Sequence, residues 1–210
     1  MRHSAPTPTG SPPLPFPSSR ASRRRRTVGS VELAREAIEN FNALLHDLRM
    51  DAPQIDADAV ASVARWLDSQ PAEQRDLLVQ LRLSRLDELK AMRTDPDWPL
   101  DPAQAHRIDL ILEYVAREND LIPDHIPVYG YLDDALLLEL AWPTLDEDVA
   151  DYRDFCNYRA EVATRSGQSV NQLDWLQARS EEGALWEQLH RVHEQQYIEY
   201  RTRVSLFRVS

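Results

Sequence analysis

Four aspartates lie within one short stretch, residues 119–134, at Asp120, Asp124, Asp133 and Asp134. Carboxylate oxygens are the ligands that hard cations such as Mg²⁺ and Ca²⁺ prefer, and His125 lies in the same stretch. If these side chains converge, they could hold a cation or line a catalytic site. The spacing of an EF-hand loop is absent, which weakens the metal hypothesis.

The same four residues also suit a purely structural role. Asp120 and Asp124 stand where turns and helix caps need a side-chain acceptor. Asp133 and Asp134 fall in the first turn of a predicted helix, where the helix dipole favours negative charge. Each such contact stabilises a helix end by about 0.5–2 kcal/mol, which explains the aspartates without a ligand. We therefore favour the structural role, and we expect no cofactor and no catalytic residue.

Two prolines bend the chain inside this stretch. Pro123 and Pro127 cannot occupy the interior of a regular helix, and each pushes the residue before it out of the helical region. Gly130 is the only glycine between Gly29 and Gly167. Because helix-compatible sequence lies on both sides, the stretch is predicted to form a rigid, partly buried corner between two helices.

Apolar side chains at steps of three and four predict helices along the rest of the body. We expect six to eight of them, with no convincing strand and no internal repeat. Asp101, Pro102 and Gln104 form the capping pattern of one helix start. The predicted helices begin near Ser30, Asp56, Pro71, Asp101, Tyr131, Thr144 and Ser169.

The composition of two of these helices predicts how far each one is buried. The helix predicted from Pro71 to about Arg93 carries arginines interleaved with Asp76, Asp87 and Glu88, which is typical of a solvated, salt-bridging flank. These arginines are Arg75, Arg82, Arg85 and Arg93. The helix predicted at 131–141 is almost wholly apolar, so we expect it in the core.

Charge divides the chain into two parts. Residues 1–27 carry six arginines and no acidic residue, a charge of +6. The whole chain has a net charge of −11, so the remaining residues carry −17. An acidic body repels phosphate-rich partners, and we therefore do not expect a nucleic-acid-binding protein.

Location is constrained by two further features. Cys156 is the only cysteine, which excludes an intramolecular disulfide and favours a reducing compartment. No apolar run reaches the roughly 18–20 residues that a membrane-spanning helix needs. We expect a cytoplasmic protein that is soluble or peripheral to a membrane.

Residues 1–28 hold six of the fourteen prolines and have no apolar period, so we predict a disordered tail before a helical body at 29–204. Four roles stay open for the tail. The first is a solvated tail, the second the product of an upstream start codon, and the third an organellar transit peptide. The fourth is a basic arm for anionic lipid or nucleic acid through Arg23, Arg24, Arg25 and Arg26. A secretory signal is excluded, because no apolar segment follows the arginines.

The corner carries a pattern in fixed register: Asp-Leu-Ile-Pro-Asp, Ile-Pro, Gly, then Leu-Asp-Asp. The matching residues are Asp120, Leu121, Ile122, Pro123, Asp124, Ile126, Pro127, Gly130, Leu132, Asp133 and Asp134. This pattern resembles the signature of the YkvA-like family, a domain of unknown function (DUF 1232) of small bacterial proteins. The resemblance covers residues 105–142 and implies a helical hairpin with no settled activity. His125 and Tyr129 depart from it and make the corner more polar.

Other residues that could do chemistry have simpler explanations. His190 and His193 lack the spacing of a metalloprotease helix, which needs histidines at i and i+4. Cys156 lies in a helical pattern and is expected to be a small core residue. His46 and His106 lie on polar helix flanks and are expected at the surface.

These observations predict an all-α protein, a single multi-helix, bundle-like domain behind a disordered tail. Its expected function is that of a non-enzymatic module that binds a protein partner or lies against a membrane surface. The alternative is an enzyme or metal-binding protein that uses the carboxylates at the proline-bounded corner.

Overall fold

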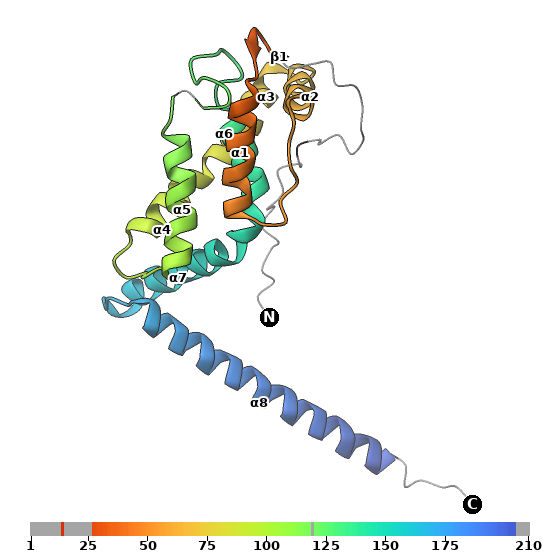
Figure 1. Cartoon of the computed structure of the whole chain (residues 1–210). Coiled ribbons are helices and arrows are strands. Elements are labelled where there is room, and N and C mark those ends of the chain that lie inside the picture. Colours follow the sequence, from red (N-terminus) through yellow and green to blue (C-terminus); the bar gives the residue numbers. More distant parts are fainter. Residues whose placement is uncertain (1–13, 15–26, 119, 205–210) are drawn as a thin grey trace, which may run out of the picture. The chain divides into compact units, whose positions relative to one another are not determined.

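The computed structural model describes Leu14, residues 27–118 and residues 120–204, with side chains as far as residue 188. The predicted all-α class is confirmed, because eight α-helices account for most of these residues (Figure 1). The rest of the predicted tail, with Arg23–Arg26, lies outside the described residues. The helices are α1 Arg35–Leu48, α2 Ala57–Asp68, α3 Ala72–Leu83, α4 Arg85–Thr94, α5 Pro102–Val115, α6 Leu132–Ala141, α7 Asp146–Ser166 and α8 Gln172–Val204.

Contacts within the chain divide it into two compact units. The first takes the chain up to Asp95 together with Leu100–Asp151, and the second takes Pro96–Pro99 and the chain from Tyr152 on. No boundary inside 29–204 was predicted from the sequence. The boundary lies within α7, where neither proline nor glycine interrupts the helix.

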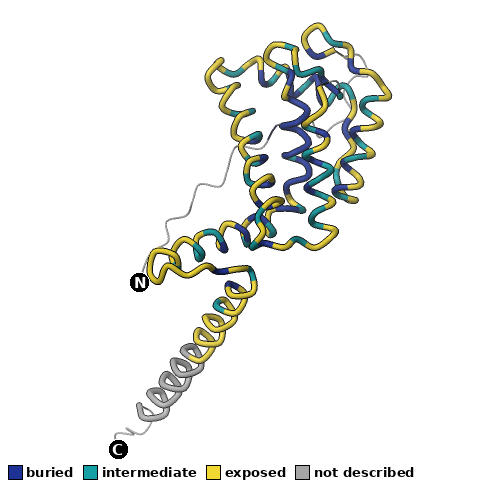
Figure 2. The backbone as a smooth tube through the Cα atoms, turned by 90° about the vertical axis from the view of Figure 1, so that its left-hand side faces the viewer, coloured by how far each residue is buried: buried dark blue, intermediate teal, exposed yellow. Residues whose placement is uncertain are grey.

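Helix α6 is the centre of the first unit. Nine of its ten residues are buried, and Figure 2 shows it as a dark-blue helix with partly exposed helices around it. A helix that is apolar on every side is stable only where neighbours cover all of it. Helices α1, α3 and α5 pack against it, and each fully buried leucine contributes about 1.5–3 kcal/mol. The predicted place of 131–141 in the core is confirmed.

Side-chain caps begin two helices where the sequence predicted them. The Asp56 carboxylate accepts a hydrogen bond from the backbone N–H of Ala59 at 2.8 Å. Asp101 accepts from the N–H of Gln104 at 2.9 Å, and the Gln104 side chain accepts from the N–H of Asp101 at 3.0 Å. This reciprocal capping box sets the start of α5, the helix that leads into the corner.

The start of the body differs from the prediction. Ser30 does not cap a helix but lies with Gly29 in a two-residue turn between two short strands, β1 Thr27–Val28 and β2 Val31–Glu32. Gly29 has a φ of 56°, in the left-handed region that glycine reaches without steric cost. The first helix begins only at Arg35.

The helix predicted from Pro71 to about Arg93 is two helices that meet at Ser84. Arg82 is fully buried, so its predicted place on a solvated flank was wrong. Its Nε donates a hydrogen bond to Oε2 of Glu139 on α6 at 3.0 Å, and its Nη1 donates to the carbonyl oxygen of Leu78 at 2.8 Å. The error has a physical reason: the carboxylate that compensates the buried charge lies 57 residues away in the sequence.

The second unit is built around four aromatic rings. Trp98 packs against Tyr152, Phe155 and Trp175, with ring centroids 5.5, 5.1 and 5.2 Å apart. The indole N–H of Trp175 donates to Asp154 at 2.9 Å. Each such ring pair contributes about 0.5–1.5 kcal/mol beyond the area that it buries. The cluster joins residues 96–99 to α7 and α8.

The lengths and compositions of these helices bear on membrane crossing. Within residues 27–118 and 120–204, none is both long enough and apolar enough to cross a bilayer.

Candidate functional site

Between α5 and α6 the chain folds into the predicted corner. Backbone hydrogen bonds close its turns. The N–H of Asp124 donates to the carbonyl oxygen of Glu118 at 3.2 Å, and the N–H of Gly130 donates to the carbonyl oxygen of Ile126 at 2.9 Å. A Cβ atom on Gly130 would lie 2.0 Å from the carbonyl oxygen of Asp124. Only glycine fits there, so the corner is closed tightly around this residue.

Val128 holds a strained backbone conformation within the corner. Its φ is 75°, in the left-handed region, which is a rare conformation for a β-branched residue. Such strain costs about 1–3 kcal/mol and persists only where the surrounding structure fixes it. The side chain is 50% exposed, so little burial of this residue offsets the strain.

Asp133 ties the corner to the helices on both sides. It is fully buried, and its Oδ2 accepts hydrogen bonds from the hydroxyl of Tyr114 at 2.9 Å and from the backbone N–H of Ile122 at 3.1 Å. One of the two donors is thus a backbone N–H, and the other is a side chain on α5. Sequence reasoning missed Tyr114, although it follows Ile108 and Ile111 at steps of three on the buried face of α5.

The other buried carboxylate oxygens of the cluster lack such partners in the described structure. Asp134 is 1% exposed, and neither of its oxygens accepts a hydrogen bond. The same holds for both oxygens of Asp120 and for Oδ1 of Asp124 and of Asp133. A buried acceptor without a partner costs about 1–3 kcal/mol, and more when it is charged. A hydrogen bond from a backbone amide therefore accounts for the burial of one oxygen of Asp133. It does not account for the burial of the six carboxylate oxygens of the cluster that have no partner.

Burial favours the protonated form of these acids. It raises the pKa of Asp133 and of Asp134 to about 8, and the negative charge of Asp120 adds to both shifts. Burial also raises the pKa of Asp120. Near neutral pH, Asp133 and Asp134 favour the uncharged acid.

Two surface hollows flank the corner, and they divide the aspartates between them. The α1 hollow, about 350 Å³, is formed by α1, the end of α5 and the corner, and Asp120 lines it. The α3 hollow, about 290 Å³, is formed by α3 and the corner, and Asp124 and His125 line it. Asp133 and Asp134 line neither hollow. The fold gathers the four aspartates in one region but does not place them around one opening.

This arrangement also lacks the geometry of a metal centre. In the described part of the chain, no group of three or more histidine, cysteine, aspartate or glutamate side chains is placed to hold a metal ion. Such a site needs several oxygens at about 2.0–2.6 Å from one point.

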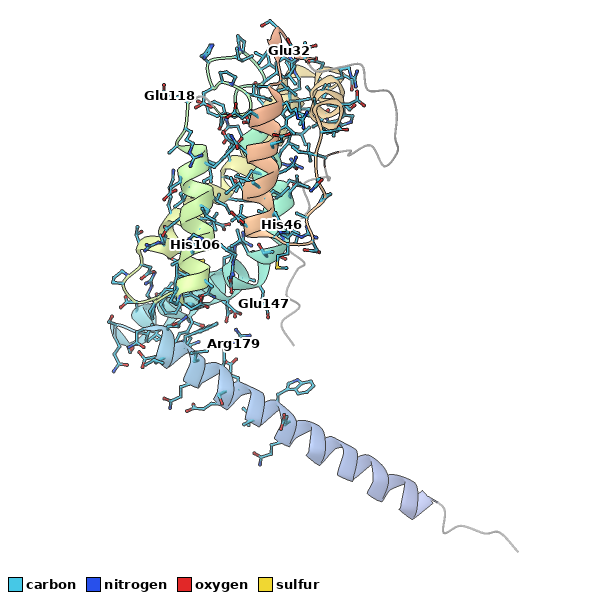
Figure 3. The ribbon with its side chains drawn as sticks, viewed as in Figure 1. Glu32, His46, His106, Glu118, Glu147 and Arg179 are labelled. Atoms are coloured by element: carbon cyan, nitrogen blue, oxygen red, sulfur yellow. The ribbon has the colours of Figure 1, made fainter. Side chains whose placement is uncertain are left out.

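The remaining candidate residues lie elsewhere. His46 on α1 and His106 on α5 are exposed, as predicted (Figure 3). Cys156 on α7 is half-buried, and its Sγ lies 3.8 Å from Nη2 of Arg159. His190 and His193 belong to the part of α8 whose side chains are not described.

Fold and site together define an all-α protein organised around an acidic, proline-bounded corner. Residues 108–140 match the family model DUF1232, described as a protein of unknown function. The match covers most of α5, the corner and nearly all of α6, and it confirms the resemblance drawn from the corner residues. No match was found among curated proteins or among solved structures.

Proposed function

We propose that the protein is a non-enzymatic helical module that binds a protein partner at the α3 hollow. The observation that carries the proposal is the exposed apolar surface at this hollow. Val128 and Tyr131, which line it from the corner, are 50% and 48% exposed. On α3, which forms the other wall, the apolar residue that lines the hollow is Val79.

Exposed apolar side chains that gather in one region mark interaction sites more often than chance exposure does. Here the two exposed residues, Val128 and Tyr131, belong to the DUF1232 segment, and they face α3, which packs against α6. The strained φ of Val128 supports the same proposal, because backbone strain of about 1–3 kcal/mol is characteristically kept at functional sites.

The carboxylates support a non-enzymatic function. Asp133 and Asp134 are 0% and 1% exposed, so a substrate in solution does not reach them without opening the core. The alternative, an enzyme or a metal-binding protein, requires the four carboxylates to face one cleft, whereas Asp120 and Asp124 line different hollows.

The proposed location is the cytoplasm, with peripheral contact to anionic membrane through Arg23–Arg26. The support is compositional: a tail of charge +6 and a single cysteine, Cys156. Flotation with liposomes that contain anionic lipid tests the membrane contact. Binding that is lost on deletion of residues 1–28 supports it, and flotation that is unchanged by the deletion contradicts it.

Affinity capture with matched variants tests partner binding. The full chain, Val128→Asp and Met50→Asp are used to capture proteins from an extract of the native host, and candidates are then purified and titrated. Aspartate tolerates a positive φ better than most residues, so Val128→Asp changes the surface without breaking the turn. Met50 is 83% exposed and lines neither hollow, which makes it the control.

The proposal expects a partner that binds the full chain and Met50→Asp and binds Val128→Asp at least tenfold more weakly. It is contradicted if every captured protein binds all three chains equally well, or if none of them binds after purification.

A further inference from the structure

The α3 hollow holds two buried polar atoms that have no partner among the described residues. They are Nε of Arg75 on α3 and Oδ1 of Asp124 in the corner, and both residues line the hollow. Because both atoms are buried, bulk water does not satisfy them. Each unmet group costs about 1–3 kcal/mol, so a ligand that pairs with them regains that free energy.

One of these atoms is a donor and the other is an acceptor. The charge of Arg75 is already balanced, since its Nη1 lies 3.6 Å from Oδ1 of Asp68. Asp68 is held in turn by the Tyr129 hydroxyl, which donates to its Oδ2 at 2.5 Å. Arg75 therefore offers the hollow a hydrogen-bond donor rather than an unpaired charge.

The polarity of the hollow excludes a strongly charged ligand. Asp76 and Asp124 oppose an anion, and a bare cation offers no acceptor to Nε of Arg75. The remaining wall mixes the apolar residues Val79, Ile126 and Pro127 with the polar residues Gln80 and His125. The group that fits is neutral, carries one acceptor and one donor, and has an apolar attachment.

We propose that the α3 hollow binds an extended segment of a protein partner, with a backbone carbonyl oxygen on Nε of Arg75 and a backbone N–H on Asp124. An apolar side chain of the segment packs against Val128 and Tyr131. A peptide in extended conformation leaves its N–H and C=O groups free, whereas a helix uses them internally. This inference rests on the proposed function and names its partner class.

Entry of the segment requires a local rearrangement. Nε of Arg75 and Oδ1 of Asp124 are shielded in the free protein, so the segment reaches them by displacing side chains at the edge of the hollow. Val128 and Tyr131 line the hollow and are half exposed, so packing does not lock their side chains in place.

Selection from a phage-displayed library of random linear peptides tests this inference with the full chain as bait. Arg75→Lys removes the Nε donor and keeps the charge opposite Asp68, and Asp124→Ala removes the acceptor. Asp120→Ala is the matched control, because it removes a corner aspartate that lines the other hollow. Circular dichroism establishes that each variant is folded.

We expect selected peptides that bind the full chain and Asp120→Ala equally. Arg75→Lys and Asp124→Ala should each weaken binding by about tenfold, as should N-methylation of one peptide backbone nitrogen. In the free protein burial raises the pKa of Asp124, and an N–H donor from the peptide should lower it in an NMR titration of that carboxyl.

Two outcomes overturn the inference. One is that no linear peptide is selected, and the other is that both variants bind the selected peptides as the full chain does. If a purified partner nevertheless depends on Val128 in the capture experiment, the proposed function stands and only the extended-segment inference falls. If no partner depends on Val128 while peptides bind through Arg75 and Asp124, the hollow stands as a peptide-binding site, and the partner-binding role that the proposed function gives to Val128 falls.

Discussion

Asp133 and Asp134 are neighbours in the sequence but meet different surroundings. Asp133 accepts hydrogen bonds from the Tyr114 hydroxyl and from the backbone N–H of Ile122, whereas neither oxygen of Asp134 has a partner in the described structure. Burial without a partner favours the protonated acid. The effect of protonation on stability is therefore easier to measure at Asp134, because no hydrogen bond is lost when that residue is replaced.

Asp134→Asn should remove a dependence of stability on pH. An aspartate has a pKa near 3.8 when unperturbed, and folding raises that of Asp134 to about 8. Between these values the folded protein binds the extra proton, so this residue's contribution to the free energy of unfolding falls as the pH rises through about 8. Relative to the natural chain, the variant should gain on the order of 6 kcal/mol between about pH 4 and pH 9.

Urea unfolding at several pH values measures this difference. Asp87→Asn, on an exposed residue of α4, serves as the control. A difference between Asp134→Asn and the natural chain that stays constant with pH contradicts the assignment of the proton to the folded state.

Gly130→Ala and Gly183→Ala should have opposite effects. A Cβ on Gly130 would lie 2.0 Å from a backbone oxygen, so alanine should lower the free energy of unfolding by about 3 kcal/mol or more. A Cβ on Gly183 in α8 meets nothing within 4 Å, so alanine should stabilise that helix by about 0.5–1 kcal/mol.

Thermal unfolding measures the first effect, and hydrogen exchange of the amides near residue 183 measures the second. A stable Gly130→Ala protein would show that the corner is looser than the structure has it.

At this scale the sequence predicted the positions of the corner residues better than their partners. The backbone of the corner is restricted directly by Pro123, Pro127 and Gly130, and such local effects can be predicted from the sequence. The partner of Asp133 was missed, because no local pattern pairs the Tyr114 hydroxyl with a carboxylate 19 residues further along the chain. The φ of Val128 follows from the closure of the turns around it, which no local pattern records.

Among the elements, α3 and α6 form the pair with the most unusual contact. The buried guanidinium of Arg82 meets Glu139, whose side chain is 19% exposed. The Arg85 guanidinium also lies over the Trp142 ring at 4.4 Å. These contacts join α3 to the central helix and the start of α4 to Trp142, the residue that follows that helix, and so support one wall of the α3 hollow.

Arg82→Ala should lower the free energy of unfolding by about 3–5 kcal/mol, because it leaves Glu139 without its closest cation. Replacing the pair together, as Arg82→Met with Glu139→Leu, should recover most of that loss, since apolar residues of similar volume can replace a buried ion pair. Chemical denaturation of the two variants and of the natural chain provides the measurement. Equal losses in the single and double variants would show that the pair is not coupled.

Helix positions followed from the sequence where local signals were strong. The apolar run at 131–141 and the capping box at Asp101 are such signals, and both were confirmed. The hairpin at 27–32 was missed, because two-residue strands carry too little pattern to detect. The third helix was predicted too long, since no proline or glycine marks its division at Ser84.

In the whole molecule, the division into two units was also invisible in the sequence. The boundary after Asp151 lies inside the uninterrupted helix α7, whereas sequence reasoning looks for linkers rich in proline or glycine. The second unit includes residues 96–99, which are distant in the sequence from its other residues. Trp98 brings them together with α7 and α8 by packing, and packing of this kind is not encoded in local spacing.

Trp98→Ala should destabilise the second unit selectively. Loss of a buried tryptophan costs about 3–5 kcal/mol, and its ring contacts all belong to that unit. We expect faster hydrogen exchange for amides of residues 152–178 and little change for amides of α6. An equal acceleration in both units would contradict their independence.

The central claim is that this protein acts by binding a protein partner where α3 meets the corner. Hydrogen exchange of the full chain, free and bound to the purified partner that depends on Val128, tests it most directly. We predict slower exchange at residues 75–80 and 124–131, and no change at residues 172–188 of α8. Protection that is absent from the corner and appears only in α8, or in no segment at all, would contradict the claim.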